Sequence, residues 1–186
     1  MSDRPAGPGG EDTAARAAPA RGGETATGVL LGVDVGEARV GLAASDAVGL
    51  LAHPVATLAR DHARGSDLDE IAEEVSTRGA VGVVVGLPRT LSGQEGLAAR
   101  RARDYADSLQ RRLEVPVRLY DERLTTVDAH RNLHRSGVRS RDQRVVVDQA
   151  AAVLILQAVL DARRAGRPAG VPLRARKPRT RRSGPT

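Results

Sequence analysis

The chain has 186 residues, no cysteine, no Phe or Trp, and a formal net charge of +6. The lack of cysteine excludes disulfides and thiolate metal sites, so any metal ligands would be oxygen atoms or the four histidines. Because two tyrosines are the only large aromatic side chains, a surface that reads nucleic acid by stacking bases is also excluded, and such a partner would be held mainly by its phosphates.

Residues 1–27 are rich in Pro, Gly, Ala and charge and have no hydrophobic periodicity, which predicts a disordered N-terminal tail. One domain is expected at 28–165. Its expected elements, in chain order, are strands at 29–35, 40–44 and 54–58, a helix at 67–78, a strand at 80–86, a helix at 95–113, a strand at 117–121, and helices at 125–135 and 142–164.

The order of these elements predicts a mixed sheet. The first strands are joined by short connections, which favours antiparallel pairing, whereas the later alternation of strands and helices requires parallel pairing. The fold class is therefore predicted as α/β, with a mixed five-stranded sheet flanked by helices.

Residues 166–186 form a second expected disordered tail, and this one is basic. Nine of the 29 Lys and Arg residues lie at or after Arg163, where no acidic residue follows, which leaves 20 basic against 23 acidic residues in the rest of the chain. The segment reflects either the composition of an arginine-rich chain or an arm that contacts a nucleic-acid backbone. Neither a membrane-spanning apolar run nor a signal-peptide core is visible, so we expect a cytoplasmic protein without a membrane partner.

One carboxylate, Asp34, interrupts the apolar first strand in the segment LLGVDVGEARVG at 30–41. Burying an isolated charged carboxylate costs several kcal/mol unless cations or several donors meet it. Asp34 is therefore either a turn residue that caps the hairpin or part of a functional site.

Two later segments place acids at comparable positions. LYDERLTT at 119–126 runs from a strand into Asp121 and Glu122, at the strand end where parallel sheets build sites, although a surface ion pair would also explain these residues. In RVVVDQAAAVLILQAVL at 144–160, Asp148 shares a helix face with apolar residues, so its carboxylate is expected to point toward the sheet. A buried structural aspartate is the alternative for Asp148.

Three acids that converge would repel one another unless cations hold them together. Oxygen ligands of this kind suit Mg²⁺ or Mn²⁺, and two such ions about 4 Å apart can activate water for phosphodiester cleavage. Strand alternation puts Asp121 and Glu122 on opposite faces, and the sequence does not decide which of them faces the site.

Four motifs in this order resemble the YqgF/RuvX family of pre-16S ribosomal RNA nucleases, which are related to Holliday junction resolvases: GVDVGEARVGLAASD at 32–46, VVVGLPRTLSGQEG at 83–96, YDERLTT at 120–126 and VDQAAAVLILQ at 147–157. The resemblance implies an RNase H-like fold and a metal-dependent endonuclease whose catalytic, metal-binding acids are Asp34, Glu122 and Asp148. It further implies that the substrate is RNA, cut at the 5′ end of pre-16S rRNA during ribosome biogenesis.

Three further positions could contact the substrate. Gly86 opens a Gly/Pro loop whose amides could hold a phosphate, Arg123 adjoins the acids, and Asp46 could lie near Asp34 across the hairpin. Each also has an ordinary explanation, namely a tight turn, an ion pair and a second turn. The same acids would serve an endonuclease that cuts branched DNA, and a nucleic-acid or transcription adaptor without enzymatic activity is a third hypothesis. The sequence does not fix the oligomeric state.

Overall fold

The computed structural model describes residues 27–89, 95–124 and 141–173. Its first three elements are antiparallel strands. They are β1 (Leu30–Val35), β2 (Arg39–Ser45) and β3 (Ala52–Ala59), and each pairs with the next. The connections between them are too short for a crossover, so the antiparallel pairing predicted for the first strands is confirmed.

The parallel half of the sheet follows. The strands β4 (Gly82–Leu87) and β5 (Val117–Asp121) extend the sheet from β1, with β4 parallel to β1 and β5 parallel to β4. The helices α1 (Ser66–Thr77) and α2 (Leu97–Gln110) supply the crossovers, and a short 3₁₀ turn, η1 (Glu122–Leu124), follows β5. Every residue of β4 is buried, as expected for a strand that is covered on both faces.

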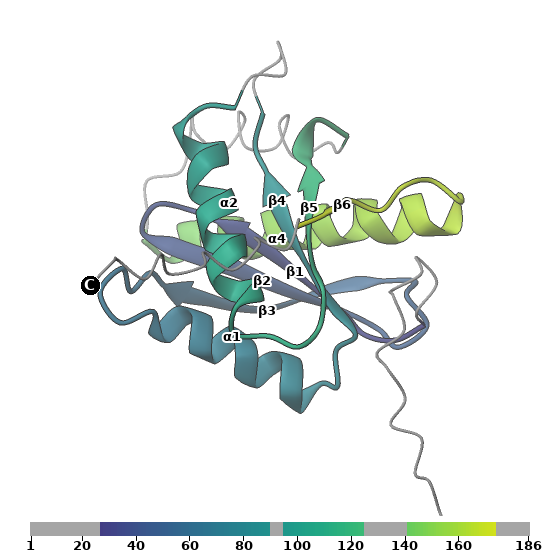
Figure 1. Cartoon of the computed structure of the whole chain (residues 1–186), viewed down its shortest axis with the longest axis horizontal. Coiled ribbons are helices and arrows are strands. Elements are labelled where there is room, and N and C mark those ends of the chain that lie inside the picture. Colours follow the sequence, from purple (N-terminus) through teal and green to yellow (C-terminus); the bar gives the residue numbers. More distant parts are fainter. Residues whose placement is uncertain (1–26, 90–94, 125–140, 174–186) are drawn as a thin grey trace, which may run out of the picture.

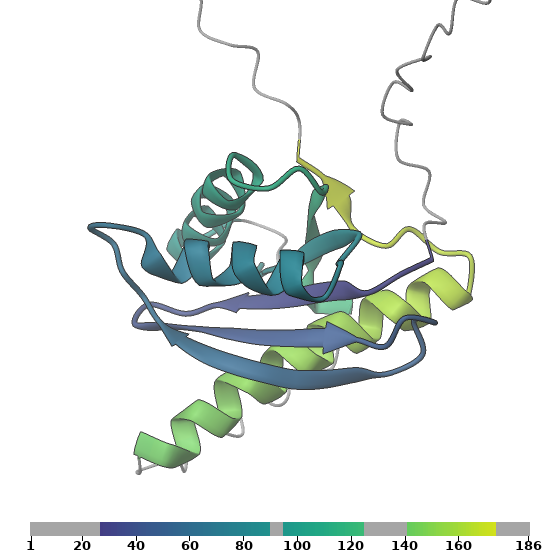
Figure 2. The ribbon, with the colours of Figure 1, turned by 90° about the horizontal axis from the view of Figure 1, so that it is seen from below.

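Helices cover both faces of the sheet. Figure 2 shows α1 and α2 on one face and the long helix α4 (Arg141–Arg164) on the other, and Figure 1 shows α4 passing behind the strands. Strand residues alternate between two cores: Leu31 and Val33 belong to the core beneath α1 and α2, whereas Leu30, Val84 and Tyr120 pack in the core with α4. Side-chain alternation therefore assigns each strand residue to one of two faces.

The sheet has six strands, in the order β3-β2-β1-β4-β5-β6, so the prediction of five was wrong. The strand β6 (Val171–Pro172) pairs antiparallel with β5, and Ala169 just before it is buried. Two residues without alternation are too short to be recognised in the sequence as a strand. The sheet thus extends beyond residue 165, where the domain was expected to end.

Several expectations lie outside the described residues: the helix at 125–135, most of the N-terminal tail and the basic residues after Leu173. Within the part of the chain that is described, no helix is long and apolar enough to cross a membrane.

Candidate active site

Asp34 is a strand residue and not part of the hairpin turn. It lies one residue before the end of β1, is 6 % exposed, and pairs with Gly41 of β2. Two residues earlier, a Cβ on Gly32 would lie 2.7 Å from Cβ of Leu156 on α4. Because strand side chains alternate, Asp34 faces α4 as Gly32 does.

Glu122 lies on the same face, at the end of β5. It is 1 % exposed, and its Oε1 lies 2.5 Å from the point that a Cβ on Gly86 would occupy. Ile155 of α4 reaches within 2.6 Å of the same point. The carboxylate of Glu122 therefore lies beside β4, under α4, in space that exists because residue 86 has no side chain.

Asp121 has a different environment from its neighbour. Strand alternation turns it to the α2 side of the sheet, where its Oδ2 accepts hydrogen bonds from Nη2 of Arg123 at 2.8 Å and Nη1 of Arg89 at 3.5 Å. The hydrogen bond from Arg123, more than any other contact, lowers the pKa of Asp121. Of the two adjacent acids, Glu122 is the one that shares a face with Asp34.

Asp148 is carried by α4 where this helix touches β2. Its backbone carbonyl oxygen lies 2.0 Å from the point that a Cβ on Gly41 would occupy, so helix and strand are in direct backbone contact. Its Oδ2 accepts a hydrogen bond from Nε of Arg39 at 2.9 Å, and the two side chains are 29 % and 27 % exposed. Asp148 is thus placed next to the strand partner of Asp34, with its carboxylate engaged by Arg39.

These acids are a partial match to a metal site. Asp34 and Glu122 supply buried carboxylate oxygens on one face, which is the donor type that hard divalent cations prefer. Among the described residues, however, no three His, Cys, Asp or Glu side chains are grouped as metal ligands. The donor chemistry of Asp34 and Glu122 fits such a cation, whereas the Asp148 carboxylate is bound to Arg39.

The comparison with known proteins identifies the family. The sequence model of RuvX, described as Holliday junction resolvase, matches residues 28–162. The chain belongs to the RuvX family. It is 58 % identical over 144 residues to the "Putative pre-16S rRNA nuclease" of Kineococcus radiotolerans, a match that covers 77 % of each chain. The protein of the same name from Mycolicibacterium paratuberculosis is 55 % identical over 139 residues, with 74 % of this chain and 83 % of the relative covered.

A solved structure shows the same fold. RuvC of Thermus thermophilus, in complex with a Holliday junction substrate, superimposes with a TM-score of 0.50 at 16 % identity, over 78 % of this chain and 99 % of that one. Family and fold together confirm the predicted RNase H-like nuclease, a hydrolase of phosphodiester bonds that binds nucleic acid. Nucleases with this fold generally use divalent metal ions.

Two of the other predicted positions in this RuvX chain need correction. Asp46 does not lie near Asp34, because β2 runs antiparallel to β1 and carries Asp46 to the far end of the hairpin. There its carboxylate accepts hydrogen bonds from the backbone N–H groups of Leu50 and Leu51, each at 2.9 Å, and so stabilises a turn. Gly86 is not a loop residue, since it lies inside β4 and pairs with Tyr120.

The structure also adds two residues that the sequence analysis did not single out, Arg39 and Gly41. Both lie in the motif GVDVGEARVGLAASD, and both face α4 once the pairing of Asp34 with Gly41 is known. The signal was the two-residue spacing between them, but it becomes readable only when the register of the hairpin is fixed.

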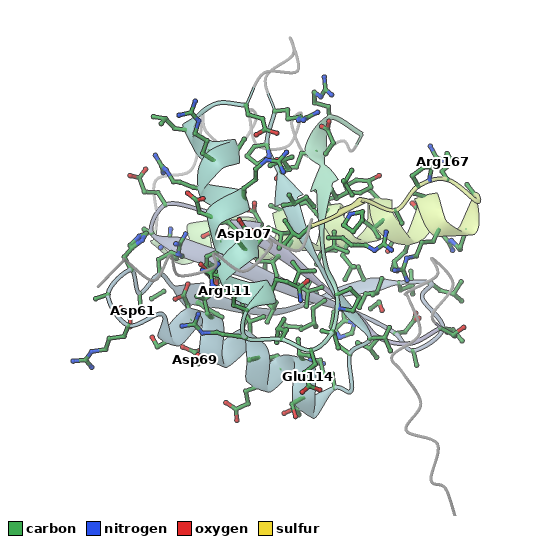
Figure 3. The ribbon with its side chains drawn as sticks, viewed as in Figure 1. Asp61, Asp69, Asp107, Arg111, Glu114 and Arg167 are labelled. Carbon is green, nitrogen blue, oxygen red and sulfur yellow. The ribbon has the colours of Figure 1, made fainter. Side chains whose placement is uncertain are left out.

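A cavity of about 420 Å³ lies away from these acids, between the loop before α1 and the helix α2. Figure 3 shows Asp61, from this loop, and Asp69, on α1, on that side of the molecule. In its wall, buried Asp67 accepts a hydrogen bond from the Tyr105 hydroxyl at 3.0 Å and pairs with Nε of Arg60 at 3.2 Å. The buried acid of the cavity wall, Asp67, is therefore neutralised by Arg60.

Proposed function

We propose that this RuvX protein is a Mg²⁺- or Mn²⁺-dependent endonuclease that processes the 5′ end of pre-16S rRNA, with Asp34, Glu122 and Asp148 as its metal-binding acids. The observation that carries the proposal is the burial of Asp34 and Glu122 on the face covered by α4, the helix that also carries Asp148. The names of the relatives, which are 51 to 58 % identical, support the choice of substrate.

The backbone supports both buried acids. Asp34 lies within a central strand that is paired on both sides, and Glu122 directly follows a strand that is paired to β4. Carboxylates on such supports lose little conformational entropy when they bind a ligand, which favours a fixed coordination geometry. Divalent cations held there would lower the pKa of a bound water and stabilise the leaving oxygen of the phosphodiester.

The side chains around the acids serve the same end. The glycines at 41 and 86 let α4 and the Glu122 carboxylate approach the strands closely, and apolar Ile155 beside Glu122 keeps bulk water away from that carboxylate. Because water is largely excluded there, a divalent cation bound beside these carboxylates would be attracted to them more strongly than in bulk water.

A direct test compares four variants of the full chain on a pre-16S leader RNA, with Mn²⁺, Mg²⁺ or EDTA. We expect Asp34→Asn and Glu122→Gln to lose at least a hundredfold in cleavage rate while RNA binding persists, and Asp148→Asn to be similarly impaired. Asp121→Asn is the matched control, because it alters the adjacent acid on the opposite face. If Asp121→Asn is inactive and Glu122→Gln is active, the assignment of the acids is wrong.

A DNA junction endonuclease is the second candidate, and the description of the matched family as Holliday junction resolvase favours it. The same variants should be assayed on a four-way DNA junction beside the RNA. Preferential cleavage of the junction would replace the rRNA substrate and leave the metal-binding acids in place. Binding of either nucleic acid without cleavage under any metal condition would contradict the proposed activity altogether.

A further inference from the structure

We infer that Arg39 is a positioning residue that sets the divalent-metal concentration at which the site closes, because it competes with the metal for the carboxylate of Asp148. The inference rests on the proposed function, since it takes Asp34, Glu122 and Asp148 as metal ligands. It adds a role for a residue that is not itself a ligand but holds the carboxylate of Asp148.

The geometry gives Arg39 a hold on one of the three acids. Its Nε donates to Oδ2 of Asp148 at 2.9 Å, and the bond joins the start of β2 to α4 across 109 residues of sequence. A carboxylate oxygen that accepts from a guanidinium is unavailable to a cation in the same direction, and the guanidinium charge repels the cation as well. A cation that takes Oδ2 as a ligand must therefore displace this hydrogen bond, and one that takes the other oxygen is repelled by the guanidinium charge.

Only side chains need to move for that exchange. The backbone of Arg39 is held in the ladder with β3, where it pairs with Ala59. The backbone of Asp148 is fixed against β2 by its close approach to Gly41. Both side chains keep more than a quarter of their surface exposed, so rotation into solvent is open to each of them. Rotation of exposed side chains is fast, on the order of nanoseconds, and needs no rearrangement of the fold.

The pair also has a benefit for the metal-free protein. Without a cation, Arg39 neutralises the Asp148 carboxylate, which would otherwise add a negative charge to the face that carries Asp34 and Glu122. A partly exposed ion pair is weak enough for a divalent cation to displace, since pairs of this kind change an equilibrium by about two- to fivefold. The arrangement therefore weakens metal binding without preventing it.

The test is Mn²⁺ affinity of the full-length, nucleic-acid-free protein, measured from the free-Mn²⁺ signal in electron paramagnetic resonance. We expect Arg39→Gln to bind Mn²⁺ about two- to fivefold more tightly than the wild type. In an Asp148→Asn background the same substitution should change the affinity little, because the contested carboxylate is gone. Arg101→Gln removes the same charge beside the same hairpin, where it pairs with Glu37, and should leave the Mn²⁺ affinity unchanged.

The outcomes separate this inference from the proposed function. If Asp34→Asn and Asp148→Asn weaken Mn²⁺ binding but Arg39→Gln does not strengthen it, the metal site stands and Arg39 only ties α4 to β2. An equal gain from Arg39→Gln with and without Asp148 would reduce its effect to general charge, which also overturns the inference. If neither aspartate affects Mn²⁺ binding, the proposed site and the inference fail together. Unfolding curves of each variant show whether the fold is retained.

Discussion

Substitution of Gly41 by alanine is the sharpest perturbation that the structure offers. The added Cβ would lie 2.0 Å from the carbonyl oxygen of Asp148 and 2.6 Å from its carbonyl carbon. Both atoms belong to the backbone of α4, so rotation of a side chain cannot relieve the clash. Either α4 must lift from the sheet or β2 must bend, and both movements separate Asp148 from Asp34, the strand partner of Gly41.

The magnitude follows from the size of that shift. Ordinary van der Waals contact begins near 3.4 Å. To reach that distance, α4 and β2 must move apart by about 1 Å or more, and α4 covers most of one face of the sheet. Overpacking of a well-packed interface costs about 1–3 kcal/mol, and we expect Gly41→Ala to reach or exceed about 3 kcal/mol because no side chain can yield. Cleavage should fall by at least tenfold, since a displacement of about 1 Å at a reacting centre can cost about a hundredfold.

Urea unfolding followed by circular dichroism measures the first effect, and cleavage of the leader RNA measures the second. Gly96→Ala is the matched control, because among the described residues, its chain neighbours aside, no atom lies within 4 Å of the added Cβ, and its φ is an ordinary −80°. An unfolding free energy within about 0.5 kcal/mol of the wild type for Gly41→Ala would refute the close contact of α4 with β2, and with it the placement of Asp148.

Three further results are expected. Tyr105→Phe should lower the unfolding free energy by about 1–3 kcal/mol in urea titrations, because buried Asp67 loses the hydroxyl that donates to it, and an unchanged value would contradict that hydrogen bond. The hydrogen bond from Arg103 lowers the pKa of Glu95 from 4.5 to about 2, so the stabilisation by this pair is present above pH 4.5 and is lost as the pH falls toward 2. In Glu95→Gln the unfolding free energy should depend less on pH between 4.5 and 2. Identical pH profiles for the variant and the wild type would contradict this effect of the Glu95–Arg103 pair. Removal of 174–186 should reduce the log–log salt slope of RNA binding by about 0.7–0.9 per lost phosphate contact. An unchanged slope would mean that these basic residues only reflect the arginine-rich composition of the chain.

Much of the fold was predictable because its elements carry strong local patterns. The buried strand at 82–87 and the long helix that ends at Arg164 were expected within a few residues, since an uninterrupted β-branched run and an apolar helical face each have one simple structural solution. The strand at 171–172 has no such pattern. It exists because the chain returns to the open edge of β5, and that is a tertiary effect which no local window contains.

Part of the candidate site could likewise be predicted from the sequence, and part of it could not. Asp34, Glu122 and Asp148 could be chosen from their positions at strand ends and on an apolar helix face, and their family motifs agree with that choice. Which of Asp121 and Glu122 shares a face with Asp34 is known only from the structure, because strand alternation says that the two differ but not which core each one faces. Asp46 was misplaced for a related reason: nearness across a hairpin depends on register, and Asp46 lies at the opposite end of β2 from the residue that pairs with Asp34.

The glycines show most clearly what sequence reading alone misses. A glycine beside a strand end suggests a turn or a phosphate-binding loop, and Gly86 was interpreted in that way. In the structure, Gly41 and Gly86 lie inside strands, and their missing side chains admit the backbone of α4 and the carboxylate of Glu122. Each gap brings one candidate acid close to the sheet. The missing side chains at Gly41 and Gly86 leave room for α4 and for the Glu122 carboxylate against the sheet. Substitutions at these glycines should therefore damage the site without altering any of its carboxylates.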